Sequence, residues 1–305
     1  MNQFRNPPRR RVDGVLLLDK PAGMTSNAAL QKARRLLNAA KAGHTGTLDP
    51  MATGLLPLCF GEATKFSGEL LAAGKRYAAT LRLGVRTDTA DAEGRVLEIR
   101  PAAVEREQIE AVLDRFRGDI LQVPPMHSAL KRDGRPLYEY ARKGIEVERT
   151  PRKISIFSLN IVYFEEDRLE IDVDCSKGTY VRSLAEDIGE ALGCGAHLSA
   201  LRRVRIGNLG LDGAATLEAL ETLPPEARDM LLRPADALLT ELPRLTFDET
   251  AAQCFSHGRP VRHPSGPAAG RLRVYGVDDR FLGLGAMTPD GRVAPIRLVA
   301  AAIEK

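Results

Sequence analysis

One loop of the chain combines residue types that can do chemistry. It runs from Gly43 to Gly54, reads GHTGTLDPMATG, and carries Asp49 immediately before Pro50. The proline disfavours helical backbone at Asp49 and pushes this residue towards an extended conformation. The three glycines would let the loop approach a ligand closely. The loop therefore predicts a carboxylate held against a ligand, although Asp-Pro by itself is also an ordinary turn.

A second candidate functional residue is an arginine that stands where a positive charge is unfavourable, at the start of a predicted helix. Residues 178–182 read GTYVR, where a predicted strand gives way to a predicted helix. With Thr179 as N-cap, Arg182 would stand third in the helix, where a capping box has Glu or Gln. A cation there also opposes the helix dipole, at about 0.3–1 kcal/mol. We interpret this as a sign of an anionic partner; an ion pair with Glu186, or a helix that starts elsewhere, would also explain it.

The sequence lacks the motifs of several other kinds of active site. The segment Gly68–Lys75 has the wrong spacing for a phosphate-binding loop, and Ser128 is not in a G-x-S-x-G nucleophile elbow. The five histidines show no H-x-x-x-H pattern, and the four cysteines are not spaced like zinc or redox pairs. We therefore expect no bound metal, and the cysteines to be reduced.

A basic excursion is predicted at residues 124–153, which open with Pro124-Pro125. From Lys131 to Lys153 there are eight Lys or Arg against four acids, with Tyr138 and Tyr140 interleaved. Basic residues mixed with aromatic ones are typical of nucleic-acid contacts. A solvated, mobile surface segment is the alternative. The RNA-contact candidates are Lys131, Arg132, Arg142 and Lys143.

The elements that must position these residues follow from hydrophobic patterning. Residues 14–18 form an apolar run typical of a buried strand, and residues 76–83 alternate as a half-buried strand. Amphipathic helices are expected after Thr25-Ser26 and over residues 105–116. Helices and short strands without regular βαβ spacing favour an α+β fold with a mixed, largely antiparallel sheet flanked by helices.

The domain organisation follows from composition. Residues 1–12 combine Pro, Asn and four arginines and predict a disordered basic arm, free in solvent or in contact with phosphates. Residues 13–241 would form one domain, and a change to short strands and glycines near Leu242 predicts a small β-rich domain over 242–305. No apolar run is long enough for a membrane helix or secretory signal, so a cytoplasmic protein with no membrane partner is expected. A net charge of +4 fits an anionic partner.

Long blocks of the sequence resemble the TruB family of bacterial tRNA pseudouridine synthases. The match runs in order from about residue 14 to 206 and resumes near residue 257, where the chain resembles a PUA RNA-binding domain. The matching blocks are LDKPAGMTS (18–26), the loop 43–54 with LLP (55–57) and GEATK (61–65), KRY (75–77), TDT (87–89), SALK (128–131), YEYAR (138–142), CSKGTYVR (175–182), GCGAHL (193–198) and HGRPV (257–261).

The resemblance implies roles for residues of this chain. Asp49 matches the catalytic aspartate, and Arg182 matches the arginine that pairs with it. Further matches are Tyr77, which would stack on the target uracil; His44, which would fill the gap that the uridine leaves; the pocket residues Tyr180 and Leu201; and the supporting cations Lys20 and Lys65.

The implied reaction isomerises uridine 55 in the T-arm loop of tRNA. Its atoms are conserved, so no cofactor is expected. The uridine must be flipped out of the stack, with Tyr77 a candidate base for the C5 proton. The expected partner is the tRNA T-arm stem-loop, bound by a monomer that needs no other protein. The alternatives are a guide-RNA-dependent pseudouridine synthase subunit and a protein that binds or folds RNA.

Overall fold

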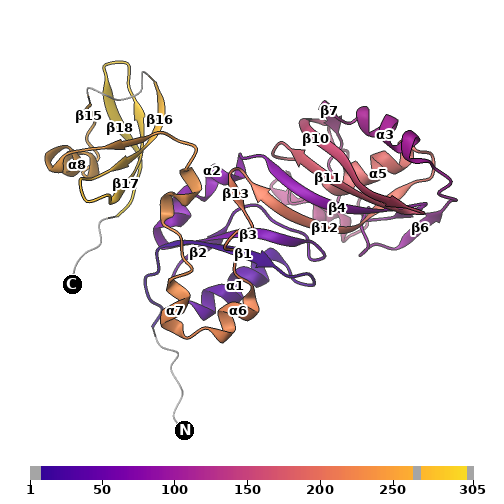
Figure 1. Cartoon of the computed structure of the whole chain (residues 1–305), viewed down its shortest axis with the longest axis horizontal. Helices are drawn as coiled ribbons and strands as arrows, with labels where there is room; N and C mark the ends of the chain where they lie inside the picture. Colours follow the sequence, from indigo (N-terminus) through magenta and orange to yellow (C-terminus); the bar gives the residue numbers. More distant parts are fainter. Residues whose placement is uncertain (1–7, 264–268, 301–305) are drawn as a thin grey trace, which may run out of the picture.

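Two β-sheets organise the chain in the computed structural model, which describes residues 8–263 and 269–300 (Figure 1). Within these residues, the larger sheet has nine strands and the smaller has five. The loop with Asp49 joins two strands of the larger sheet, and the smaller sheet lies in the C-terminal part of the chain. This arrangement confirms the predicted α+β fold class with an additional β-rich part.

The larger sheet has the order β1-β3-β12-β4-β11-β10-β7, with β2 beside β3 and β13 beside β12. Neighbouring strands are antiparallel except β3 and β12, which are parallel. The sheet is therefore largely antiparallel, as the sequence predicts. Its strands are β1 (Gly14–Lys20), β2 (Ala42–His44), β3 (Thr53–Phe60), β4 (Lys75–Leu83), β7 (Gly118–Gln122), β10 (Arg152–Glu165), β11 (Arg168–Cys175), β12 (Ala196–Ile206) and β13 (Leu209–Gly210).

Alternating apolar side chains create the main core. In β4, Tyr77, Ala79, Leu81 and Leu83 are buried while the residues between them are more exposed, which is the pattern of a strand with one covered face. The covering helices are α1 (Ser26–Leu36), α3 (Arg106–Asp114) and α5 (Val181–Ala191). Helix α5 lies so close to β12 that a Cβ on Gly189 would come within 2.1 Å of the backbone nitrogen of Ala196.

Shorter elements connect the strands. They are the 3-10 helix η1 (Gly61–Phe66), α2 (Ser67–Leu71), β5 (Val85–Thr87), β6 (Val96–Ile99), β8 (Lys131–Arg132), β9 (Arg135–Pro136), α4 (Leu137–Ala141), α6 (Leu217–Thr222), α7 (Pro225–Asp229) and η2 (Ala235–Leu239). The hairpin β8–β9 and α4 lie within the predicted excursion at residues 124–153, so this segment has secondary structure of its own.

The smaller sheet has the order β14-β16-β17-β18-β15 and its own apolar core. It comprises β14 (Arg244–Thr246), β15 (Val261–Arg262), β16 (Gly270–Tyr275), β17 (Phe281–Met287) and β18 (Arg292–Leu298), with α8 (Glu249–Ser256) beside it. It also contacts the rest of the chain. The rings of Phe66 and Phe281 lie 5.4 Å apart, and Leu284 is buried in a second cluster with residues of β1 and β3.

One expectation about the N-terminus is wrong where the structure describes it. Residues 8–12 of the expected disordered arm are ordered: Arg10 N–H donates to Asn38 O at 2.9 Å, and Ala40 N–H donates to Arg10 O at 2.9 Å. Val12 is buried in the main core. These backbone contacts offset the low apolar content that suggested disorder. Residues 1–7 of the expected arm lie outside the described residues.

Candidate active site

The loop between β2 and β3 holds Asp49 at the edge of the main core. The Ser26 hydroxyl anchors the loop, because it accepts a hydrogen bond from Leu48 N–H at 2.8 Å and donates to Leu48 O at 3.0 Å. Ala52 N–H donates to Asp49 O at 3.1 Å, which closes a turn around Pro50. The neighbouring Leu48 is buried, whereas 36% of the Asp49 side chain is exposed. The loop therefore presents a fixed and accessible carboxylate.

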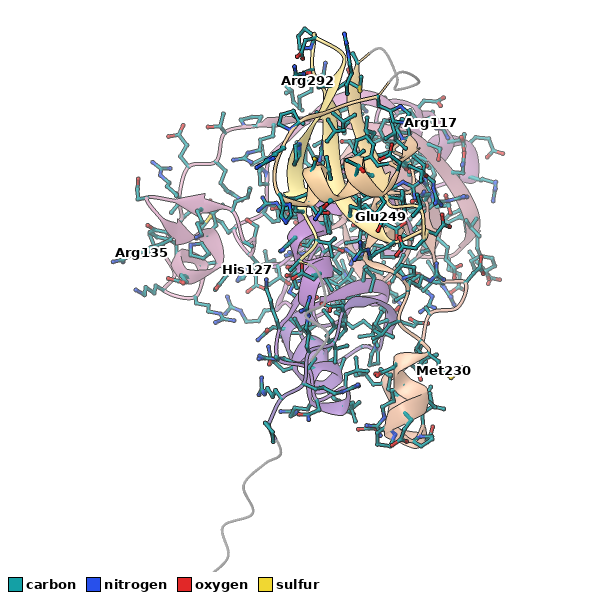
Figure 2. The ribbon with its side chains drawn as sticks, turned by 90° about the vertical axis from the view of Figure 1, so that its left-hand side faces the viewer. Arg117, His127, Arg135, Met230, Glu249 and Arg292 are labelled. Carbon is teal, nitrogen blue, oxygen red and sulfur yellow. The ribbon has the colours of Figure 1, made fainter. Side chains whose placement is uncertain are left out.

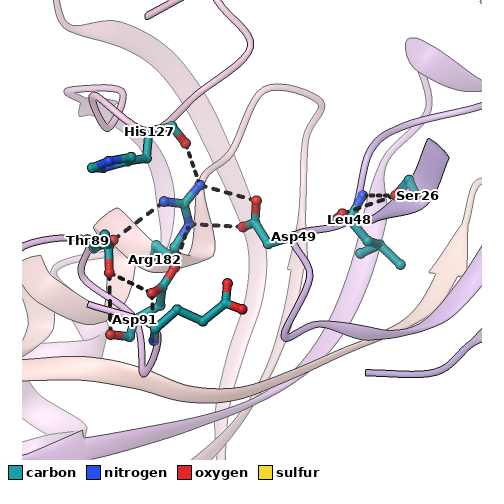
Figure 3. A network of polar contacts seen from close by, with 8 residues as sticks. Ser26, Leu48, Asp49, Thr89, Asp91, His127 and Arg182 are labelled. Carbon is teal, nitrogen blue, oxygen red and sulfur yellow. Dashed lines mark hydrogen bonds and ion pairs between the residues drawn. The ribbon is translucent and has the colours of Figure 1, made fainter. Parts of the chain in front are cut away.

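Arg182 reaches this carboxylate from the first turn of α5 (Figure 3). Its Nε lies 2.9 Å from Asp49 Oδ2, and its Nη2 donates to His127 O at 2.8 Å. The helix is capped by Tyr180, so the expected Thr179 cap is wrong by one residue and Arg182 is the second helical residue. Asp49 is thus an anionic partner of the kind that the misplaced cation suggested.

A second carboxylate, Asp91, shares the guanidinium (Figure 3). Asp91 Oδ2 lies 3.6 Å from Arg182 Nε, and its side chain is 5% exposed. Asp91 Oδ1 accepts hydrogen bonds from the Thr89 hydroxyl at 2.6 Å and from Glu93 N–H at 3.1 Å. Burial and the nearby Asp91 and Asp49 raise the pKa of Glu93. Arg182 is therefore oriented by a buried carboxylate on one side and presented to Asp49 on the other.

Lys20 holds the other side of the loop. It is fully buried, and its Nζ donates to the carbonyl oxygens of Pro21 at 2.8 Å, Met24 at 2.7 Å and Pro50 at 3.3 Å. Burial lowers the pKa of Lys20, and the opposing charge of Asp49 partly offsets this effect. The predicted supporting cation is thus next to the reactive loop and fixes the backbone directly after Asp49.

Tyr77 and Leu201 are brought to one side of the sheet by strand pairing. Tyr77 of β4 pairs with Arg203 of β12, and Leu201 lies two residues before Arg203 on the same strand. Successive residues alternate in direction along a strand, so Leu201 and Arg203 face the same side. Both Tyr77 and Leu201 are buried. Burial raises the pKa of Tyr77, and the charge of Arg203 opposes this increase.

Arg203 is a buried cation that the sequence reasoning did not select. It is 1% exposed, and its guanidinium donates to Leu55 O at 2.8 Å and to Gly46 O at 2.9 Å. It therefore connects β12 to both ends of the reactive loop. Gly54 allows the two strands to meet there, since a Cβ at this position would lie 2.3 Å from Arg203 O. The sequence signal that could have identified Arg203 was a charged residue at an inward-facing position of a strand.

His44 and Tyr180 complete the surroundings of the loop. His44 is half-buried, and burial together with the charge of Arg203 lowers its pKa. Tyr180 is half-buried, with its backbone held by the Gln122 side chain through bonds of 2.8 and 3.0 Å. Within residues 8–263 and 269–300, the buried side-chain atoms without a hydrogen-bond partner include His44 Nδ1 and Thr45 Oγ1. Both atoms are buried, so the hydrogen-bonding capacity of these two polar groups is unmet in this structure.

Lys65 is not brought to this site. Its Nζ pairs with Glu62 at 2.7 Å and donates to Leu298 O of β18 at 2.9 Å. It therefore connects η1 to the C-terminal sheet, where it stabilises the junction between the two parts of the chain. The expectation that Lys65 supports the reactive loop is not borne out by these contacts, because a motif match does not indicate which way a side chain points.

The four RNA-contact candidates lie on the 124–153 segment, where Figure 2 labels His127 and Arg135. All four side chains are exposed. Arg132 donates to Glu148 O at 2.7 Å, and the Arg142 guanidinium lies 5.3 Å from the centre of the Tyr138 ring. The bond from Arg182 to His127 O joins the base of this segment directly to the reactive centre. Lys131 and Lys143 are the other two exposed cations.

The described residues hold no group of three or more His, Cys, Asp or Glu side chains that could bind a metal ion. No helix within residues 8–263 and 269–300 is long and apolar enough to cross a membrane.

Comparisons with known proteins agree with one another. Three family descriptions match successive parts of the chain: TruB family pseudouridylate synthase (N terminal domain) over residues 34–181, tRNA pseudouridylate synthase B C-terminal domain over 182–240, and Pseudouridine synthase II TruB, C-terminal, over 243–299. A protein of Aromatoleum aromaticum named tRNA pseudouridine synthase B is 60% identical, over 98% of this chain and 96% of its own length. The protein of that name from Stutzerimonas stutzeri is 57% identical, over 95% and 97%.

Solved structures give the same result. A chain of an H/ACA RNP bound to a substrate RNA containing 2'-deoxyuridine matches with a TM-score of 0.71 at 25% identity, over 98% of this chain and 92% of that one. A chain of a Cbf5–Nop10–Gar1 complex matches with a TM-score of 0.72 at 26% identity, over 98% and 91%. The chain therefore belongs to the TruB family of pseudouridine synthases.

Proposed function

We propose that this protein isomerises uridine 55 in the T-arm loop of tRNA to pseudouridine, with Asp49 as its catalytic residue. The observation that carries this proposal is the pairing of Asp49 with Arg182 at 2.9 Å, in a loop where the carboxylate remains 36% exposed. A group that attacks a substrate must be both fixed and accessible, and Asp49 is both.

The chemistry requires one carboxylate. The bond from uracil N1 to ribose C1′ breaks with its electron pair left on the base, the base turns over, and C5 bonds to C1′. C5 then loses its proton and the freed N1 takes one up, so the number of protons does not change. A glycosidase uses two carboxyl groups because it must protonate a poor leaving group and activate water. In this isomerisation uracil leaves as a delocalised anion and stays in the site, so no water is activated. All atoms are retained, and no cofactor is needed.

The surroundings of Asp49 suit a flipped base. Extruding a nucleotide costs a few kcal/mol of stacking, which contacts in the pocket must offset. We assign the ring of Tyr77 to stacking on the uracil, His44 to the space that the base leaves, and Leu201 and Tyr180 to the pocket walls. Because burial raises the pKa of Tyr77, its ring stays a neutral phenol near neutral pH. That form suits stacking better than removal of the C5 proton.

The rest of the chain would hold the RNA. We assign residues 13–241 to the catalytic domain and 242–305 to a PUA-like RNA-binding domain. The exposed cations of the 124–153 segment would contact phosphates of the T-arm stem-loop. The bond from Arg182 to His127 O, which joins the base of this segment to the reactive centre, supports this assignment. We therefore propose a cytoplasmic enzyme that acts on tRNA as a monomer.

A guide-RNA-dependent subunit is the second candidate, because the similar solved chains belong to ribonucleoprotein complexes. The 55–60% identical relatives, each named tRNA pseudouridine synthase B, favour action on tRNA without a guide. A tRNA-folding activity would be a further use of the same binding surface.

The test uses purified protein, treated with EDTA, with unmodified tRNA transcript and with an isolated T-arm stem-loop. We expect pseudouridine at position 55 of both RNAs, without other proteins or guide RNA. Product at another position, or product only after a guide RNA is added, would refute the proposal.

A further inference from the structure

A hollow lined with arginines lies at the C-terminal end of α1, on the side of the helix away from the reactive loop. Its volume is about 840 Å³. Five arginines (Arg9, Arg10, Arg34, Arg35 and Arg228) line it against two acids, Glu226 and Asp229. We call these five residues the arginine notch. Such an excess of cations in a concave surface is typical of an anion-binding site.

Three of the arginines are used by the fold. Arg10 donates to Leu37 O at 2.9 Å and pairs with Asp229. Arg34 donates to Ala39 O at 3.1 Å, and Arg228 donates to Leu36 O at 2.6 Å. These bonds satisfy carbonyl groups at and beyond the end of α1, where cations also interact favourably with the helix dipole. The floor of the notch is therefore rigid, and its three arginines have a structural explanation.

The other two arginines have no such explanation. Arg9 and Arg35 are exposed, and neither side chain makes a hydrogen bond or an ion pair within residues 8–263 and 269–300. Like charges held close together repel one another unless an anion lies between them. Guanidinium groups bind phosphate oxygens through two parallel hydrogen bonds, which a preformed floor would favour.

The notch and the 124–153 segment lie on opposite sides of the reactive loop. Helix α1 connects the notch to the loop, since Ser26 at its first turn bonds Leu48 beside Asp49. The 11 residues of α1 span about 16 Å. The 124–153 segment joins β7 to β10 at one edge of the sheet. Helix α1 packs against β2, which pairs with β3 near the other edge. In Figure 2, Arg135 of the segment and Met230 lie well apart, and Met230 directly follows α7, which lines the notch.

We propose that the arginine notch binds backbone phosphates of tRNA outside the T-arm stem-loop. In this arrangement the 124–153 segment binds the T-arm, and the target uridine lies at Asp49. A different part of the same tRNA would then contact the notch. The inference rests on the proposed function, because tRNA is the substrate assigned there. The notch is thus a second docking point that distinguishes a whole tRNA from an isolated stem-loop.

The test replaces both free arginines in one variant, Arg9→Gln/Arg35→Gln. Affinity is measured against salt concentration for full-length tRNA and for the T-arm stem-loop, both carrying cytidine at the target position so that no turnover occurs. For full-length tRNA the slope of log affinity against log salt should become shallower by about 1.4–1.8, at 0.7–0.9 per phosphate contact. At 0.15 M salt this corresponds to binding that is roughly 10- to 30-fold weaker. Binding of the stem-loop should be unchanged.

The matched control is Arg106→Gln/Arg115→Gln on and beside α3, which removes the same charge from two exposed arginines that also make no side-chain bond within the described residues. It should leave the slope for full-length tRNA unchanged. An unchanged slope in the notch variant, an equal loss on both RNAs, or an equal loss in the control would overturn the inference. Turnover of the uridine-containing stem-loop is measured in parallel, so a failure of the proposed function would be seen separately.

Discussion

Replacing Arg182 with methionine is expected to abolish activity and to destabilise the fold. The arginine side chain is 6% exposed and lies between Asp49, at 2.9 Å, and Asp91, at 3.6 Å. Methionine keeps an apolar stem of similar length but supplies no charge. Asp91, which is 5% exposed, would then be a buried carboxylate without its cation.

The magnitude follows from that exposure. Breaking a buried ion pair by removing one partner costs roughly 3–5 kcal/mol. Asp91 would keep its hydrogen bonds from the Thr89 hydroxyl and Glu93 N–H, so we expect the lower limit, about 3 kcal/mol. For a folding unit of this size each kcal/mol moves the unfolding midpoint by about 2–4 °C, which gives a fall of roughly 6–12 °C.

A second variant separates stability from catalysis. In Arg182→Met/Asp91→Asn the buried charge is removed as well, so most of the lost stability should return. Activity should not return, because Asp49 still lacks its partner. Thermal unfolding followed by circular dichroism, together with single-turnover assays on tRNA, measures both effects. A wild-type midpoint for Arg182→Met would show that Asp91 does not need its cation, and restored turnover in the double variant would show that Asp49 does not need Arg182.

Three further predictions test other parts of the structure. Replacing the four exposed cations of the 124–153 segment with glutamine should make the slope of log affinity against log salt shallower for the stem-loop, by about 0.7–0.9 per phosphate contact. The single-turnover rate at saturation should stay near wild type. An unchanged slope would show that these side chains are only solvated. Lys65→Met should lower the unfolding midpoint but leave that saturated rate unchanged, because Lys65 bonds Glu62 and Leu298 O; a large loss of the rate would return it to the catalytic site. Burial lowers the pKa of Lys75 from 10.5 to about 8, so between these pH values the unfolded chain binds more protons than the folded one. The unfolding free energy should therefore rise with pH over this range, compared with that of Lys75→Gln. Parallel pH curves for the two proteins would contradict this.

The sequence predicted the elements whose signal is local. The half-buried strand around Tyr77 and the helix after Thr25 follow from periodicity and capping, which depend on neighbouring residues. Arg182 also gave a local signal, because a cation in a first helical turn is unfavourable without a partner. The capping residue itself was wrong by one position, since Tyr180 ends the extended segment.

Contacts between distant residues could not be predicted in this way. The ion pair between Arg182 and Asp91 spans 91 positions of sequence, and the hydrogen bond from the buried Arg203 to Gly46 O spans 157. Neither contact leaves a spacing pattern, although the inward position of Arg203 in its strand was a usable signal. The ordered residues after Pro8 were missed for the same reason, because their partner is the distant segment around Asn38.

If Asp49 carries out the isomerisation, its replacement should remove the chemistry and keep the binding of tRNA. Wild-type protein and Asp49→Asn are mixed in excess with unmodified tRNA, and pseudouridine formation and tRNA affinity are measured on the same samples. We expect complete conversion at position 55 by the wild type, no detectable conversion by Asp49→Asn, and affinities within several-fold of each other. Conversion by Asp49→Asn at a rate within tenfold of wild type would contradict this.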